Sequence, residues 1–170
     1  MHGGDHKSPL KLEKLASLLS KVHQSDGKSL VWSLKPAMLA FTQHNFLENP
    51  FVGVKLPVAS CLSSIMMLNT PIPLYSDGLM RRVFKLIVET FQDLDNNEVP
   101  TFGKRLEILE FMALVRSYDL MFELECDDLI LQMFQCFFNI RKHHSDIVIT
   151  HMQSILSSCM GDYDAICKRL

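Results

Sequence analysis

The stretch "FELECDDLILQMFQCFF", residues 122–138, sets four carboxylates directly against a run of large apolar side chains. Clustered carboxylates can bind a metal ion or share a proton, but no His, Asn or further carboxylate recurs here at ligand spacing. Asp127 and Asp128 instead fit the first turn of a helix, where unpaired N–H groups favour each negative charge by about 0.3–1 kcal/mol. Glu123 and Glu125 alternate with apolar neighbours and are expected to face water. The stretch therefore predicts the start of a helix.

The helix that follows, predicted over residues 127–142, is apolar on almost every side. Its polar positions form one thin stripe of Asp128, Gln132, Gln135 and Asn139. A helix of this kind must be covered on several sides. Stacked helical repeats cover both flanks of an inner helix, so they are favoured over a closed bundle.

The amino-terminal part predicts an amphipathic helix within residues 1–27. Ser8 is the expected N-cap, Pro9 fits the first helical position, and Asp26 and Gly27 are expected to stop the helix. One face carries Leu12, Leu15, Leu18, Leu19 and Val22. A second helical segment is predicted from about Leu30 to Leu47.

Further helix starts follow at regular intervals. Asn49-Pro50 caps a helix in which Pro57 predicts a kink, because proline removes a backbone hydrogen bond. After the loop "NTPIPLYSDG", Ser76 caps a helix to about Asp93, and Thr101 opens another through Val115. The last helix follows "HHSD", with an inward face of Val148, Met152, Ile155, Leu156 and Cys159.

The helices recur in pairs, predicted over residues 30–68, 76–117 and 127–160. This spacing is close to the roughly 40–47 residues of a HEAT or armadillo unit. The sequence therefore predicts an all-α fold, a HEAT/armadillo-like superhelix (solenoid) of about three helix pairs. Residues 1–170 are expected to form a single domain, as a piece of a longer solenoid.

Composition narrows the classes of function. The formal net charge of −2 argues against a strong nonspecific hold on nucleic acid. Spaced lysines in the first segments are interpreted as the solvated face of a helix, with a DNA-binding patch as the alternative: Lys7, Lys11, Lys14, Lys21, Lys28 and Lys35. The opening "MHGGDHKSP" lacks the apolar region of a secretory signal, and "LPVASCLSSIMML" is too short to span a membrane.

Five cysteines show no paired metal-ligand spacing and are interpreted mostly as small core residues: Cys61, Cys126, Cys136, Cys159 and Cys167. A reducing compartment, cytosol or nucleus, is therefore expected. Neighbouring carboxylates would raise the pKa of Cys126 and suppress a nucleophilic thiolate.

Histidines offer the remaining candidate metal site. His143, His144 and His151 lie near Asp146, but nothing completes a zinc site. Nucleophile-elbow, phosphate-loop and dinucleotide motifs are also missing from the sequence. No catalytic, cofactor-binding or metal-binding residue is assigned, and the chain is not expected to be an enzyme.

Particular motifs are similar to those of a known family. "YSD" (75–77), "FGKR" (102–105), "ILE" (108–110) and "LECDDL" (124–129) resemble the amino-terminal part of the Pds (precocious dissociation of sisters) family of sister-chromatid cohesion regulators, especially its plant members. The resemblance extends from about residue 50 to 160. Such a family member would be a nuclear, non-enzymatic HEAT-repeat scaffold that acts in mitosis, meiosis and DNA repair.

The resemblance also implies partners. They are the kleisin subunit of cohesin, a Wapl-type releasing factor and the cohesion acetyltransferase, with chromatin association indirect and without a cofactor, membrane or small-molecule substrate. A generic helical-repeat adaptor that has lost the cohesin role, or a weak chromatin- or DNA-binding module, remains an alternative. Family members are many times longer, and "GDYDAICKRL" resembles the start of a further helix. The last repeat is therefore expected to leave an apolar face uncovered.

Overall fold

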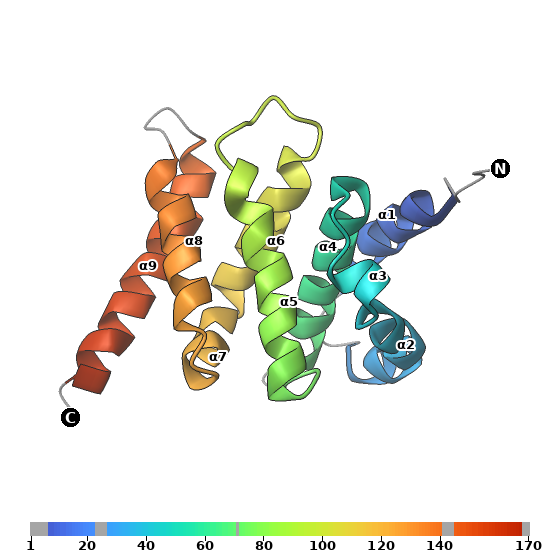
Figure 1. The fold of residues 1–170 in the computed structure, drawn as a ribbon, viewed down its shortest axis with the longest axis horizontal. Helices are drawn as coiled ribbons and strands as arrows, with labels where there is room; N and C mark the ends of the chain where they lie inside the picture. The colour runs from blue at the N-terminus through green and yellow to red at the C-terminus, as the bar shows by residue number, and fades with distance from the viewer. Residues whose placement is uncertain (1–6, 23–26, 71, 141–144, 168–170) are drawn as a thin grey trace. The chain divides into compact units, whose positions relative to one another are not determined.

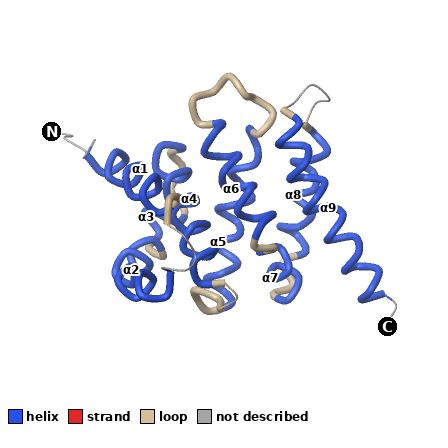
Figure 2. The backbone as a smooth tube through the Cα atoms, turned by 180° about the vertical axis from the view of Figure 1, so that it is seen from behind, coloured by secondary structure: helices blue, strands red, loops and turns tan. Residues whose placement is uncertain are grey.

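The computed structural model describes residues 7–22, 27–70, 72–140 and 145–167. In these ranges every regular element is a helix (Figure 2). The chain divides into two compact units, residues 1–87 and 88–170, and the division falls inside α5 (Asp77–Glu89). The predicted single domain with three helix pairs stays a prediction.

Helix α4 (Val52–Asn69) is the core of the first unit. Three other helices pack against it (Figure 1): α1 (Lys7–Leu19), α2 (Gly27–Phe41) and α3 (His44–Leu47). Every side chain of α4 from Leu56 to Met66 is buried, the serines included. A helix buried all round needs neighbours on several sides, and α1, α2 and α3 supply them.

The predicted bounds of the first helix were wrong at both ends. α1 already includes Ser8, and it ends at Leu19, where Lys21 and Val22 donate to carbonyls three residues back in a tightened last turn. Gly27 begins α2 instead of stopping α1, and Asp26 lies outside the described residues. Leu18 is exposed, because Ala16 occupies the buried stripe between Leu12 and Leu19.

The single helix predicted from Leu30 to Leu47 is two helices, α2 and α3. Thr42 lies at the break, and its hydroxyl donates to the Leu39 carbonyl at 2.8 Å. Such a local side-chain bond competes with helix continuation. Beyond α3, Asn49 accepts a hydrogen bond from the Phe51 N–H at 3.0 Å and turns the chain into α4. α4 continues through Pro57, and the kink predicted there stays a prediction.

The second unit contains the 3-10 helix η2 (Thr90–Asp93), α6 (Phe102–Leu114), α7 (Ser117–Glu123), α8 (Asp127–Asn139) and α9 (Asp146–Cys167). α9 packs on α6 and α7, while α8 packs on α7 and η2. Where one helix was predicted from Ser76 to Asp93, the structure has two, α5 followed by η2.

The predicted start of α8 at Asp127 is confirmed, and so is most of the inward face of α9, where only Leu156 is half-buried. α8 buries Leu129, Ile130, Met133 and Phe137, while Leu131 and Phe138 are exposed. One prediction was wrong: residues 161–167 of "GDYDAICKRL" do not start a new helix, since α9 runs unbroken to Cys167.

Candidate functional site

The four carboxylates of residues 122–138 lie at the junction between α7 and α8. Glu125 ends α7 with a φ of 53°. The Cys126 N–H donates to the Met121 carbonyl at 2.9 Å, and the Glu125 N–H donates to the Phe122 carbonyl at 3.0 Å. This pair of bonds is the Schellman arrangement that closes helix ends.

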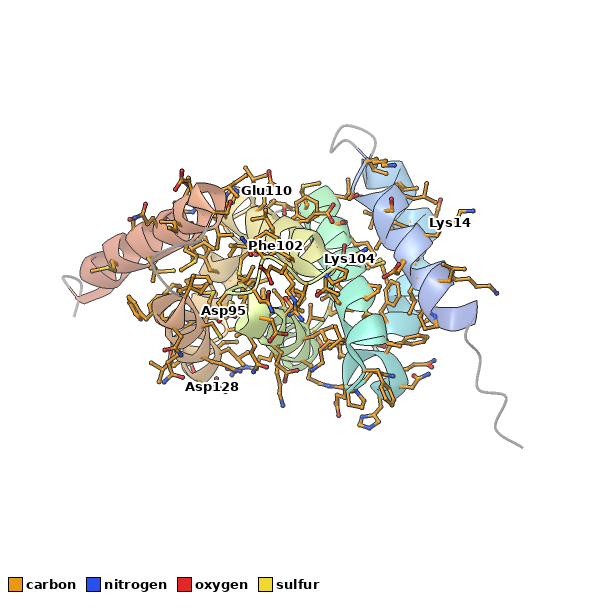
Figure 3. All side chains as sticks on the ribbon, turned by 90° about the horizontal axis from the view of Figure 1, so that it is seen from above. Lys14, Asp95, Phe102, Lys104, Glu110 and Asp128 are labelled. Carbon is orange, nitrogen blue, oxygen red and sulfur yellow. The ribbon has the colours of Figure 1, made fainter. Side chains whose placement is uncertain are left out.

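All four carboxylates at this junction face solvent. Glu123, Glu125, Asp127 and Asp128 are all exposed, and Asp128 is labelled in Figure 3. Within the described ranges, no group of three or more His, Cys, Asp or Glu side chains could hold a metal ion. The acidic stretch thus closes one helix and opens the next.

The other candidate reactive groups are not brought together in the described part of the chain. Cys126 is buried, and its thiol donates weakly to the Leu124 carbonyl at 3.9 Å. His151 is half-buried on α9 and Asp146 is exposed, whereas His143 and His144 lie outside the described residues.

The first unit contains an apolar groove that sequence reasoning missed. It has a volume of about 560 Å³, with one wall from α2 and the other from the end of α4 and the loop beyond it. We call it the Trp32 groove, lined by Val31, Trp32, Lys35, Met38, Leu68, Asn69, Thr70 and Ile72. Its position brings together segments far apart in the sequence.

Trp32 dominates the surface of the groove. It is 75% exposed, and Ile72 on the opposite wall is exposed as well. The Lys35 ammonium lies 5.6 Å from the centroid of the Trp32 ring, within cation–π range. Exposed tryptophan beside an apolar hollow is characteristic of residues that dominate protein–protein binding.

Hydrogen bonds fix the wall opposite α2. Thr70 donates to the Met66 carbonyl at 2.9 Å, and Asn69 donates to the Ile72 carbonyl at 2.8 Å. The Tyr75 hydroxyl then donates to the Met38 carbonyl of α2 at 2.8 Å. Burial raises the pKa of Tyr75 to about 12, so the hydroxyl stays a donor to higher pH than an exposed phenol would. These bonds, made largely by lining residues, tie the loop after α4 to α2 and so fix the two walls of the groove.

The electrostatics of the groove favour a neutral or anionic ligand. Among the described residues that line it, Lys35 is the charged one. No carboxylate occurs anywhere in α2. The arrangement offers an aromatic face, aliphatic walls and one cation, which suits recognition of a peptide rather than chemical reaction.

A second apolar groove, of about 400 Å³, lies within the second unit. It is lined by Phe122 and the α8 side chains Ile130, Leu131 and Phe134, with Met160 from α9. Leu131 and Met160 are exposed. The uncovered apolar face expected of the last repeat stays a prediction, and this groove is where we look for it.

One helix in the described ranges, α4, has the length and apolar composition needed to cross a membrane. Within that helix, 61% of the window is buried inside the protein. Core helices of soluble proteins have the same properties, so this is weak evidence for a membrane span.

Comparison with known proteins gives one consistent result. The family described as "Sister chromatid cohesion protein PDS5 protein" matches residues 9–170. Relatives include PDS5 homologs C and A of Arabidopsis thaliana, 38% and 40% identical over 91% and 96% of this chain. The human PDS5 homolog A is 32% identical over 79% of it. These alignments cover 18%, 10% and 10% of the relatives, so the chain spans less than a fifth of their lengths.

A solved structure confirms the predicted all-α helical-repeat fold. The chain described in "Structure of the Pds5-Scc1 complex and implications for cohesin function" superposes with a TM-score of 0.73 at 22% identity. The match covers 88% of this chain and 23% of the other. With the family match over residues 9–170, the chain belongs to the PDS5 family of sister chromatid cohesion proteins.

Proposed function

We propose that this chain is a non-catalytic, partner-binding scaffold of the machinery that regulates sister-chromatid cohesion, acting in the nucleus. The Trp32 groove is the observation that carries the proposal. It combines an exposed aromatic ring with apolar walls and a single lysine. The four carboxylates that suggest catalysis instead flank a helix junction.

Membership of the PDS5 family supports a role in cohesion. The solved relative is a Pds5 chain in complex with Scc1. The partners that we propose are the kleisin subunit of cohesin and a Wapl-type releasing factor, with chromatin reached indirectly through them. We also propose that residues 1–170 act as one helical-repeat domain.

The chemistry of the groove indicates what its ligand must carry. A segment with an aromatic or aliphatic anchor can cover the Trp32 ring, and burying about 150 Å² of that ring contributes about 4 kcal/mol before the costs of association. A carboxylate beside the anchor can pair with Lys35. The groove therefore favours a short acidic segment that contains an aromatic residue.

Binding of purified partners to the intact chain tests the proposal. Fluorescently labelled kleisin and releasing-factor chains are titrated with wild-type protein and with Trp32→Ala, and anisotropy reports binding. At least one partner should bind, and Trp32→Ala should weaken it at least about tenfold, as expected for a central aromatic anchor.

Phe51→Ala is the matched control, because Phe51 is equally exposed but does not line the groove. This variant should bind like the wild type. Failure of both partners to bind would favour the generic adaptor, and equal binding by Trp32→Ala would remove the groove from the proposal.

Exposed lysines on α1 and just after it support a second candidate function, direct DNA binding. Lys11, Lys14 and Lys21 are all exposed, and Lys14 is labelled in Figure 3. Titration of duplex DNA at two salt concentrations tests it, since phosphate contacts weaken steeply as salt rises. Micromolar binding with that salt dependence, lost in Lys14→Glu, would favour the DNA-binding function.

A further inference from the structure

A polar pocket in the second unit has a composition unlike either apolar groove. Its volume is about 330 Å³, and four carboxamide side chains line it: Gln92, Gln132, Gln135 and Asn139. Asp95 is the charged lining residue. We call it the carboxamide pocket; it shares no residue with the Trp32 groove.

Packing beneath the pocket fixes its two walls. One wall is η2 with the turn after it, and the other is α8. The Phe91 ring of η2 contacts the Phe137 ring of α8 with centroids 5.8 Å apart. Buried Arg105 of α6 also binds η2, donating to the Thr90 carbonyl and to the Asp93 carboxylate. The polar side chains therefore project from helices that pack on one another.

The carboxamides have unused hydrogen-bonding capacity. In the part of the chain that the structure describes, none of the four makes a side-chain hydrogen bond to another residue. Each presents two N–H donors and a carbonyl acceptor, the same groups that a peptide bond presents. On a helix surface, water makes the hydrogen bonds of exposed carboxamides. Where four carboxamides surround one concavity, the backbone of a ligand can take the place of that water.

The spacing along α8 matches an extended chain. Gln132, Gln135 and Asn139 lie on one stripe of the helix, and the seven helical steps from the first to the last rise about 10.5 Å. An extended peptide covers that distance with about three residues, at about 3.3 Å each. Alternate residues of an extended chain turn their N–H and C=O groups to the same edge, so the first and third residues of such a stretch can meet the carboxamides of α8.

Charge selects the kind of peptide. Residues 88–170 contain seven Lys and Arg against fourteen Asp and Glu, a net charge of −7, whereas residues 1–87 contain ten against five, a net charge of +5. Asp95 places one of these carboxylates in the pocket itself (labelled in Figure 3). A basic ligand is attracted here and an acidic one is repelled.

We propose that the carboxamide pocket binds an extended, basic segment of a partner protein. Gln132, Gln135 and Asn139 hold the N–H and C=O groups along one edge of about three of its residues, and Asp95 pairs with a lysine or arginine of the segment. The site goes beyond the proposed Trp32 groove, because it lies in the other unit and selects the opposite ligand charge. A partner with one acidic and one basic segment could occupy both.

Three fluorescein-labelled peptides test the proposal with the full-length chain. The first is Ser-Gly-Val-Lys-Val-Gln-Val-Gly-Ser. The second carries Glu in place of Lys, and the third is N-methylated at its three central peptide bonds. Anisotropy should show the first peptide binding at least about fivefold more tightly than either of the others, the effect of losing one net hydrogen bond or ion pair.

Variants assign the binding to the pocket. Gln135→Ala and Asn139→Ala should each weaken the first peptide about fivefold. Asp95→Asn should reduce the preference for the Lys peptide over the Glu peptide. Gln153→Ala is the matched control, since Gln153 is exposed on α9 outside the pocket, and it should leave binding unchanged.

Several results would overturn the proposal. They are no binding of the first peptide up to millimolar concentration, equal binding of all three peptides, or equal effects of Gln135→Ala and Gln153→Ala. Trp32→Ala separates the two sites. It should leave peptide binding unchanged, so failure of one proposal is distinguishable from failure of the other.

Discussion

Arg105 carries a guanidinium group into the interior of the second unit, where its side chain is only 5% exposed. It donates to the Thr90 carbonyl and, at 2.7 Å, to the Asp93 carboxylate. Arg82 makes a similar ion pair with Glu48 at 2.6 Å, but its side chain is 41% exposed. The two arginines therefore differ in burial more than in pairing.

Replacing each arginine measures that difference. Arg105→Ala should lower the free energy of unfolding by about 2–3 kcal/mol, because it leaves the Thr90 carbonyl buried without its donor. Arg82→Ala should cost less than about 1 kcal/mol, as exposed ion pairs do. Urea denaturation measures both, and equal losses would contradict the structural role of Arg105.

Tyr75 makes stability depend on alkaline pH. Its pKa is raised from 10.0 to about 12 by burial, and its hydroxyl donates to the Met38 carbonyl. Between these values the unfolded chain loses the phenol proton while the folded chain keeps it, so this contribution to stability falls as pH rises. Below about pH 10 both states keep the proton, and the contribution is complete.

Tyr75→Phe removes this proton from both states. The wild type should be more stable than the variant by about 1 kcal/mol near pH 9, through the hydrogen bond to Met38. That advantage should shrink near pH 11. Urea denaturation at the two pH values measures it, and an advantage independent of pH would show that the Tyr75 pKa is not raised.

Trp32 shows how far single residues can be predicted. Nothing in the sequence around it distinguishes an exposed tryptophan from a core one, because α2 is apolar on several sides. Its role depends on the loop after α4, which comes close only in the folded chain. Asp127 and Asp128, by contrast, act within their own helix turn, and the sequence alone predicts their role.

At the scale of the helices, local signals decided which bounds could be predicted. α8 and α9 each have at least one aspartate in the first turn and a buried periodic face, so both were predicted. α7 was missed because left-handed residues bound it, Arg116 and Glu125, where glycine usually gives the signal. The Thr42 side-chain bond lies at the division between α2 and α3, and the sequence gives no signal of it.

Two glycine substitutions, two residues apart, test the end of α7. Glu125→Gly should raise the free energy of unfolding by about 0.5–1 kcal/mol, because glycine adopts the φ of 53° without strain. Glu123→Gly should lower it by about 1 kcal/mol, since residue 123 is helical. Thermal unfolding of both variants gives the comparison. The same sign for both would contradict the Schellman end at Glu125.

At the scale of the whole molecule, the apolar groove of α8 and α9 predicts dye binding. The wild-type chain should bind a hydrophobic dye, and the double variant Leu131→Ser, Met160→Ser should bind less of it, because both side chains line the groove. Leu114→Ser is the control, since Leu114 is exposed elsewhere on the second unit. A clean monomer by light scattering that binds no dye would contradict an uncovered apolar face.

The two units carry opposite net charges and different candidate binding sites. The basic first unit carries the Trp32 groove, and the acidic second unit carries the carboxamide pocket. A partner that contacts both must carry both signs of charge. The proposed function depends on whether the exposed surface of Trp32 is covered when a cohesin partner binds.

Fluorine NMR of the chain labelled with fluorotryptophan measures that directly, because Trp32 is the only tryptophan in the sequence and gives one resonance. Addition of the unlabelled kleisin or releasing-factor chain should shift or broaden this resonance and protect it from a soluble paramagnetic quencher. If a partner binds while the resonance stays as accessible as in the free chain, or if neither partner binds, the account is contradicted.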